Sequence, residues 1–354
     1  MKKAARMLLV LAGAAGAAQA QAQAAVRIYG IMDAAIVGER GGKEGAVTKV
    51  TSGAAAASRI GFKGSEDLGG GLSAFYTLEM GVKIDSGQVD ATGTLFNRQA
   101  LVGLKGGFGA VALGRQYTPW HNTLVQVIDP FNTGYAGTAK NLFPHFGSNI
   151  RTSNTVTWFS PRVRGLDVEL AYSAGEQSDS SGKRQFGGAV GFVDGPLTLR
   201  LAYNSRNGDA ASGFVRSRNT LLGAQYRLTS LTLHAGYGID RGPDASPLGN
   251  PNNPYGGVAP TPSSDGREVL LGVAVPIGQG KLMASVMHKD DRTAFNQDGS
   301  SWGIGYLHAL SKRTGLYASY AHIRNRNGAG FTVANNTEAG TGNTGYNLGI
   351  RHSF

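Results

Sequence analysis

The chain ends on nine residues in which nonpolar or ring-bearing side chains alternate with small or polar ones: Tyr346-Asn347-Leu348-Gly349-Ile350-Arg351-His352-Ser353-Phe354. Successive side chains of an extended strand point to opposite faces. The rings and aliphatic groups of this segment therefore share one face, and the small or polar residues share the other. Such a strand fits a wall between lipid and water, and it also fits the edge of a soluble β-sandwich. The rest of the chain must distinguish the two.

The other end of the chain has the pattern of a secretory signal peptide. Lys2, Lys3 and Arg6 precede an apolar stretch at 7–18, and small residues follow at alternate positions up to Ala24. The apolar stretch is shorter than the roughly 20 residues that a membrane-spanning helix needs. We expect residues 1–24 to be a signal peptide and residues 25–354 to form a single domain. Removal of the three cations lowers the formal net charge from +11 to +8.

The composition restricts the class of protein further. With 54 glycines, 12 prolines and no cysteine, the chain is poor in helix formers and has no disulfide framework. Its mean hydropathy of -0.17 is too polar for a helical membrane protein, and its later apolar runs are short. A β-barrel places its lipid-facing residues at every second position, where an average does not reveal them. If the chain lies in a membrane, it therefore does so as a barrel.

Alternating segments recur along the chain, joined in turn by a short and a long connection. Apolar side chains oppose polar ones most clearly in 165–174, 196–206 and 231–241. Sixteen strands are expected, an even number as in single-chain outer-membrane barrels; they cover 26–38, 57–66, 72–84, 97–106, 109–118, 151–160, 165–174, 184–194, 196–206, 216–228, 231–241, 267–277, 281–292, 300–310, 314–325 and 345–354. The sequence predicts an all-β fold, a 16-stranded antiparallel transmembrane β-barrel. The long connection at 119–150 is rich in aromatic residues, so we expect it to pack against the inner wall.

No catalytic chemistry is apparent. None of the seven histidines has metal-ligand spacing, and neither a nucleophile motif nor a phosphate-binding loop occurs. The basic residues are spread over many strands rather than gathered in a patch with aromatic residues, which argues against nucleic-acid binding. We therefore predict that the protein is not an enzyme, needs no cofactor or metal and does not bind nucleic acid.

The charges that face the barrel interior can be read from the alternation. In the second strand the apolar residues take the lipid face, which turns Arg59 and Lys63 inward. The same reasoning turns Arg98 inward, and Arg151 stands where the 119–150 connection enters the next strand. Neighbouring cations repel one another unless water or anions screen them, and a wet lumen supplies that screening.

The 119–150 connection itself is nearly free of acidic residues. Asp129 is its one carboxylate, and Lys140 is its one lysine. A constriction with several fixed cations and about one fixed anion lowers the energy of a passing anion. We therefore predict weak anion selectivity, with a pore constriction formed by Arg59, Lys63, Arg98, Arg151 and Asp129.

Several motifs together resemble those of the Gram-negative general porins, especially the anion-selective branch of that family. The residues that carry the resemblance are 28–33, 58–69, 97–100, 113–116 and 349–354. They occur in order and extend over the whole of residues 25–354. The chain differs from cation-preferring porins in having fewer acidic residues in the 119–150 connection.

The resemblance implies an outer-membrane homotrimer of sixteen-stranded barrels, with the third external loop folded into each pore. It makes Arg59, Arg98 and Arg151 the basic cluster of the pore and Asp129 the acid on the opposing loop. It also makes Phe354 the signal read by the barrel-assembly machinery. The implied partners are outer-membrane lipid and lipopolysaccharide outside the barrel, and small solutes and anions inside it.

The function expected from these observations is ion transport and passive diffusion of small hydrophilic solutes through a water-filled channel. A solute-specific channel remains an alternative. Two further alternatives are an outer-membrane hydrolase, which would need a nucleophile and base at the barrel rim, and a surface adhesin.

Overall fold

The computed structural model describes residues 26–43, 45–178, 182–209, 213, 215–247 and 263–354. The expected signal peptide at residues 1–24 lies outside this part of the chain. The strands are β1 (Arg27–Gly42), β2 (Gly45–Ser52), β3 (Arg59–Gly69), β4 (Leu72–Lys83), β5 (Gln88–Val89), β6 (Gln99–Gly106), β7 (Gly109–Tyr117), β8 (Arg151–Phe159), β9 (Leu166–Ser173), β10 (Gln185–Asp194), β11 (Leu197–Asn207), β12 (Arg216–Arg227), β13 (Thr232–Arg241), β14 (Asp265–Ile277), β15 (Gly280–Asp291), β16 (Gly299–Ala309), β17 (Thr314–Asn325) and β18 (Thr344–Ser353). The helical turns are α2 (Pro119–Thr123), η1 (Leu124–Ile128), η2 (Ala139–Asn141) and α3 (Gly147–Ile150).

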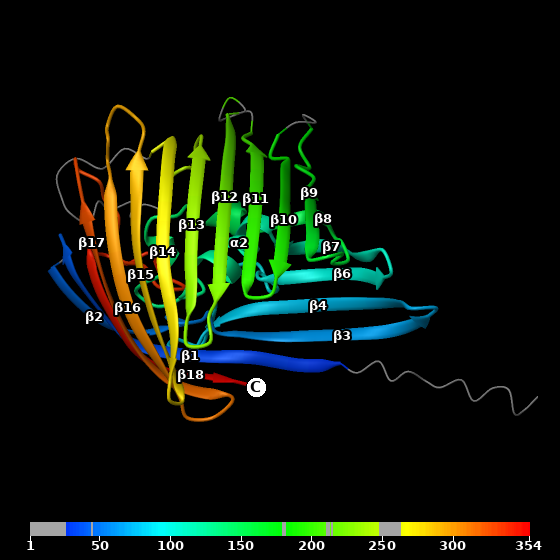
Figure 1. Ribbon diagram of the computed structural model, residues 1–354, viewed down its shortest axis with the longest axis horizontal. Coiled ribbons are helices and arrows are strands. Elements are labelled where there is room, and N and C mark those ends of the chain that lie inside the picture. The colour runs from blue at the N-terminus through cyan, green and yellow to red at the C-terminus, as the bar shows by residue number, and fades with distance from the viewer. Residues whose placement is uncertain (1–25, 44, 179–181, 210–212, 214, 248–262) are drawn as a thin grey trace, which may run out of the picture.

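The strands close on themselves into an antiparallel barrel (Figure 1). β1 pairs with β18, so that Asp33 lies opposite Arg351, and it pairs on its other side with β2 and β3. The last strand thus closes the barrel against the first. Closure leaves no open sheet edge, which is the condition for a sheet to stand in a membrane. No helix in the described part of the chain is long and apolar enough to cross a membrane.

Sixteen strands form the wall, although eighteen are labelled. β2 and β3 both pair with β1 and are two parts of one wall strand, while β5 is a two-residue strand paired only with the end of β4. The predicted 16-stranded antiparallel barrel is therefore confirmed, except that β2 was expected to be part of a connection. The break at 53–58 explains the difference, because the Asp33 carboxylate accepts the backbone N–H groups of Ala55 and Ala56 at 3.4 and 3.2 Å and holds this segment out of the wall.

The apolar side of each wall strand faces away from the barrel. In β12, Leu222 is 52% exposed, whereas its neighbour Leu221 is completely buried. Exposed leucines recur at alternate positions of the neighbouring strands, as at Leu201, Leu233 and Leu271. A band of this kind on the outer surface is what lipid contact requires.

Residues 119–150, called loop 3 below, lie on the opposite side of the wall from that band. Ile128 of loop 3 packs against Gly223 and Gly236, and a Cβ on Gly303 would lie only 2.5 Å from Cα of Gly137. The buried core of the molecule is formed where Trp120, Leu124, Ile128, Leu142 and Phe143 of loop 3 meet Leu221, Leu270 and Ile323 of the wall. Loop 3 is seen behind β11–β14 in Figure 1.

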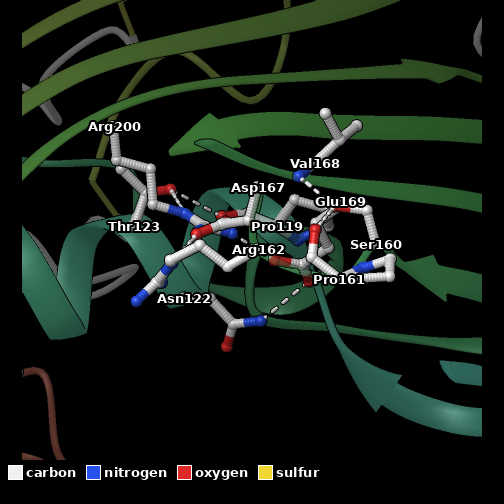
Figure 2. A network of polar contacts seen from close by, with 10 residues as sticks. All are labelled: Pro119, Asn122, Thr123, Ser160, Pro161, Arg162, Asp167, Val168, Glu169 and Arg200. Carbon is white, nitrogen blue, oxygen red and sulfur yellow. Dashed lines mark hydrogen bonds and ion pairs between the residues drawn. The ribbon is translucent and has the colours of Figure 1, made fainter. Parts of the chain in front are cut away.

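A polar network attaches the start of loop 3 to β9 and β11 (Figure 2). Arg200 of β11 donates to Thr123 Oγ1 at 3.1 Å and forms ion pairs with Asp167 and Glu169 of β9. Asn122 donates to Glu169 Oε1 at 2.9 Å. These contacts fix both the position and the orientation of α2, and with them the width of the opening that loop 3 leaves in the barrel.

Candidate pore constriction

A cavity of about 810 Å³ lies between loop 3 and the wall strands that loop 3 does not cover. Its remaining sides are formed by residues 55–57 and by residues of the last long loop, 326–343. The basic side chains that line it are those of Arg59, Arg98, Lys140, Arg151, Lys281 and Arg351, and the acidic ones are those of Glu79, Asp90 and Glu338. Six basic groups against three acidic groups leave a surplus of three positive charges around the cavity.

Three of the predicted residues, Arg59, Arg98 and Arg151, come together on one side of this cavity. Arg98 Nη2 and Arg151 Nη2 donate to the hydroxyl oxygen of Tyr117 at 2.7 and 3.0 Å. The guanidinium carbon of Arg151 also lies 4.6 Å from the centre of the Tyr117 ring. Tyr117 at the end of β7 thus holds two guanidinium groups close together, even though their charges repel.

Glu79 of β4 is the counter-charge of this cluster, and sequence reasoning did not single it out. Its carboxylate lies 2.8 Å from Arg98 Nε and 3.4 Å from Arg59 Nε, and it accepts a hydrogen bond from the Tyr29 hydroxyl at 2.9 Å. Only 4% of Glu79 is exposed. The alternation contained the signal, because Glu79 stands between two apolar residues and must turn inward.

The structure corrects the position of Asp129, which does not line the cavity. Its Oδ1 accepts the backbone N–H of Phe131 at 2.9 Å, and its Oδ2 accepts those of Thr133 and Ala139 at 2.8 and 3.0 Å. Asp129 is fully buried, and this burial raises the pKa of its carboxyl to about 6 against the pull of the three hydrogen bonds. The carboxylate shapes the turns of loop 3 instead of facing the arginines.

Lys63 also lies outside the cavity lining. It is exposed, and its Nζ stands 4.9 Å from the centre of the Tyr29 ring, further along β3 toward the short-turn end of the barrel. Phe354, the predicted assembly signal, exchanges two backbone hydrogen bonds of 3.2 Å with Gly30 of β1. Its ring covers Gly30, so the final residue completes the closure of the barrel.

Two further basic residues line the cavity from the other side of β1, and sequence reasoning did not single them out as constriction residues. Arg351 lies opposite Asp33, and Arg59 lies opposite Ile31. Only β1 therefore separates these two arginines. Two strand spacings and an offset of two residues along the strand place their backbones about 12 Å apart. Lys281, at the start of β15, extends the basic lining further round the wall. The closure of the barrel brings the first and last parts of the chain together here.

The last long loop binds loop 3 and residues 53–58 across the lumen. Asn336 accepts the backbone N–H of Ala57 at 2.9 Å and donates to the carbonyl of Thr133 at 3.0 Å. Lys140 Nζ donates to the carbonyls of Asn335 and Asn336 at 2.8 and 2.7 Å. Burial, and secondarily the charge of Arg151, lowers the pKa of Lys140 to about 8. Three segments that are far apart in the sequence thus restrict the lumen together.

A pair of histidines supports the arginine cluster from loop 3. His121 Nδ1 and His145 Nε2 share a hydrogen bond of 2.7 Å, and the His121 ring stacks on Tyr117 with a centre-to-centre distance of 4.4 Å. Burial and the nearby cations, Arg151 among them, lower the pKa of both histidines well below the usual value. The pair therefore adds no charge at neutral pH. Within the described ranges, no group of three or more histidine or acidic side chains could hold a metal ion.

Both the sequence and the fold are similar to those of known proteins. The family model of the Gram-negative porins matches residues 8–328. The chain is 32% identical over 378 residues to outer membrane porin protein 32 of Delftia acidovorans, covering 99% of each chain, and 29% identical over 402 residues to an outer membrane porin protein of Bordetella pertussis, covering both chains completely. The fold is similar to the solved anion-selective porin from Comamonas acidovorans, with a TM-score of 0.73, 25% identity, and coverage of 94% of this chain and 100% of that one.

A closed barrel with an apolar outer band and a charged, hollow interior is a membrane channel. The chain belongs to the Gram-negative porin family, and the porin family predicted from the sequence is confirmed. It is an outer-membrane protein that provides a passive diffusion channel rather than an enzyme.

Proposed function

We propose that this porin conducts small hydrophilic solutes without a specific binding step and passes anions in weak preference to cations. The observation that carries the proposal is the surplus of three positive charges around the 810 Å³ cavity. Fixed charges in a narrow wet pore lower the energy of a counter-ion and raise that of a co-ion. The anion-selective porin of Comamonas acidovorans, to which the fold is similar, supports the same direction of selectivity.

The preference is weak because part of the positive charge is already neutralised. Glu79 forms ion pairs with both Arg98 and Arg59, so the cluster presents less than its full charge to a passing ion. Salt screens the remainder over a Debye length of about 8 Å at physiological ionic strength. In this proposal the constriction residues are Arg59, Arg98 and Arg151, with Arg351 and Lys281 continuing the basic lining.

The proposal includes a homotrimer, a signal peptide at residues 1–24, and contact with outer-membrane lipid and lipopolysaccharide. It also includes recognition of Phe354 by the barrel-assembly machinery. The outer surface near the closure supports close packing of subunits, because the Tyr346 ring covers Gly38 and the Phe354 ring covers Gly30, two positions that have no side chain of their own. Chemical cross-linking in native membranes tests the trimer, since it should trap three chains and no larger product.

The reversal potential of the refolded protein in a planar bilayer, measured across a potassium chloride gradient, tests the selectivity. We expect a potential of the sign produced by chloride, which shrinks in Arg59→Gln and Arg98→Gln and is unchanged in Arg313→Gln at a short turn. A potential of the opposite sign would overturn the proposed selectivity. Current block that saturates with one particular solute would favour the alternative, a solute-specific channel.

A further inference from the structure

Two carboxyl side chains lie in contact with each other, completely buried on the inner side of the wall. Asp240 of β13 and Glu268 of β14 are 0% exposed, and their carboxyl groups are within hydrogen-bonding range of each other. Asp240 Oδ1 accepts a hydrogen bond from Asn219 Nδ2 of β12 at 2.6 Å, and Glu268 Oε1 forms an ion pair with Lys289 of β15. The second oxygen of each carboxyl group, Asp240 Oδ2 and Glu268 Oε2, has no hydrogen-bond partner within the described part of the chain.

One proton shared between these two oxygens satisfies both of them. Two ionised carboxylates in contact repel each other, so a buried pair of this kind keeps one proton. The protonated group then donates to the other group, and each free oxygen gains a partner. One negative charge remains and balances the Lys289 cation, so the three ionisable side chains are neutral together.

The connection that follows β13 is fastened to the same cluster. Residues 242–247, called the strap below, begin directly after β13. Asn219 Nδ2 donates to the carbonyl of Asp244 at 2.8 Å, and Lys289 Nζ donates to the carbonyl of Ala245 at 2.8 Å. Ala245 is completely buried, and Pro247 lines the 810 Å³ cavity. Each carboxyl group of the pair is thus linked through one side chain to the strap, and the strap borders the lumen.

The other charged groups around the pair already have partners. The carboxylate of Asp291 in β15 accepts hydrogen bonds from Ser263, Thr293 and Gln297. The carboxylate of Asp244 in the strap lies 3.5 Å from Arg206 of β11. Loop 3 contributes the uncharged ring of Phe143, which a Cβ on Gly238 would meet at 3.4 Å. In the ranges that the structure describes, the shared proton is therefore the group that completes the cluster.

We propose that the proton shared by Asp240 and Glu268 holds the strap against the wall, so that the strap lifts and widens the lumen as the pH rises. Loss of the proton leaves two buried negative charges against one lysine, and water must enter to hydrate them. The strap can lift for this purpose without breaking the strand ladder, whereas β13 and β14 cannot separate. This device is independent of the proposed anion selectivity, because the arginines of the constriction take no part in it.

The direction and size of the pH effect follow from proton linkage. The seated strap covers a pair that holds one proton, whereas the hydrated pair under a lifted strap holds none at neutral pH. Lifting therefore releases one proton and becomes about ten-fold more frequent for each unit by which the pH rises. The effect extends from about pH 5, above the range of hydrated carboxyl groups, to about pH 8, where buried carboxyl groups lose their protons.

The test measures how often the strap lifts, by the labelling of a single cysteine in the full-length mature barrel. The chain has no cysteine of its own, so Ala245→Cys reports the strap alone. Gly107→Cys at a short turn is the exposed reference, because an added Cβ there meets nothing within 4 Å. The ratio of the two maleimide-labelling rates cancels the pH dependence of the thiol reaction. We expect this ratio to rise about ten-fold per unit between about pH 6 and about pH 8.

Two variants replace the shared proton by a permanent donor. Asp240→Asn keeps the oxygen that accepts from Asn219 and offers an amide N–H to Glu268, and Glu268→Gln offers an amide N–H to Asp240 in the same way. Either variant should keep the strap seated and make the labelling ratio independent of pH. Asp194→Asn is the matched control, because it removes an exposed carboxyl group at a short turn and should keep the full pH dependence.

Single-channel recording tests the same dependence without a cysteine. A level of higher conductance should be visited more often as the pH rises, in the same proportion as the labelling ratio, and not in Asp240→Asn. A labelling ratio independent of pH in the parent barrel overturns the proposal. So does a pH dependence that persists in both amide variants or is lost in Asp194→Asn. Labelling of Ala245→Cys as fast as the reference at about pH 6 would show that the strap is not seated and would also overturn it. Wild-type circular dichroism spectra show that the variants are folded.

Discussion

Replacement of Gly303 in β16 by alanine should narrow the channel, although Gly303 itself is covered by loop 3. A Cβ at this position would lie 2.5 Å from Cα of Gly137 in loop 3, whereas ordinary contacts begin at 3.4 Å. The obstacle is backbone and cannot rotate away, so loop 3 must retreat from the wall by about 1 Å. Gly137 is seated on the wall, because Ser285 of the neighbouring strand also donates to its carbonyl at 3.2 Å. A displacement of Gly137 away from the wall therefore carries it into the lumen.

Two measurements follow from this displacement. Single-channel conductance of Gly303→Ala should fall, and its free energy of unfolding should drop by about 1–3 kcal/mol, the usual cost of overpacking. Gly188→Ala is the matched control, because this strand glycine lies on the outer face and its added Cβ would meet nothing closer than 3.5 Å. A Gly303→Ala channel with wild-type conductance would refute the reasoning, since loop 3 would then not be seated against the wall at this point.

Three other changes have distinct expected outcomes. Glu79→Gln removes the counter-charge of Arg98 and Arg59, so it should shift the reversal potential toward stronger anion preference. It also leaves the buried Arg98 without its carboxylate, so the free energy of unfolding measured in urea should fall by about 3 kcal/mol or more. A loss of anion preference would contradict this. Burial raises the pKa of Asp129 from 3.8 to about 6, so the folded state binds the proton of this carboxyl more tightly than the unfolded state does. The free energy of unfolding should therefore fall as the pH rises from about 4 to about 6. Asp129→Asn should flatten that pH dependence and leave the ion selectivity unchanged. A pH profile identical in wild type and variant would exclude Asp129 as its source. Deletion of Phe354 should slow insertion into membranes, measured as the folded fraction over time, but leave the conductance of inserted channels normal; the reverse result would argue against an assembly role.

The wall of the barrel was predictable because its signal is local and repeated. In β12 or β13, each lipid-facing side chain is recognised from its neighbours two residues away. The same alternation correctly predicted that Arg59 and Arg98 point inward. β2 was missed because nothing in its sequence indicates that the break at 53–58 is held by Asp33, a residue of the preceding strand. Alternation identifies the two faces of a continuous strand, but it does not show where a strand is interrupted.

The positions of the constriction residues could be predicted only where they follow from the alternation of inward and outward side chains along one strand. Asp129 was misplaced because its carboxylate is occupied by backbone N–H groups two, four and ten residues along the chain, a folding of loop 3 that has no periodic signal. Arg351 was placed on the water-facing side by the alternation, but its proximity to Arg59 arises only when β18 pairs with β1. The face of a strand on which a side chain lies can be read from the sequence. Which side chains of different strands come close together depends on the register in which the strands pair in the closed barrel.

The hydrogen bonds of Asn336 set an order of events for the assembly of this channel. They join the last long loop to Ala57, 279 residues earlier in the chain, and to Thr133, 203 residues earlier. Contacts of such long range cannot form until the strands between them are paired. Loop 3 can already be attached to β9 and β11 at that stage, but the part of the lumen that the last long loop restricts stays open until the last hairpin arrives. An incompletely closed barrel would then leak more than the mature channel, so an assembly defect and a gain of permeability should appear together.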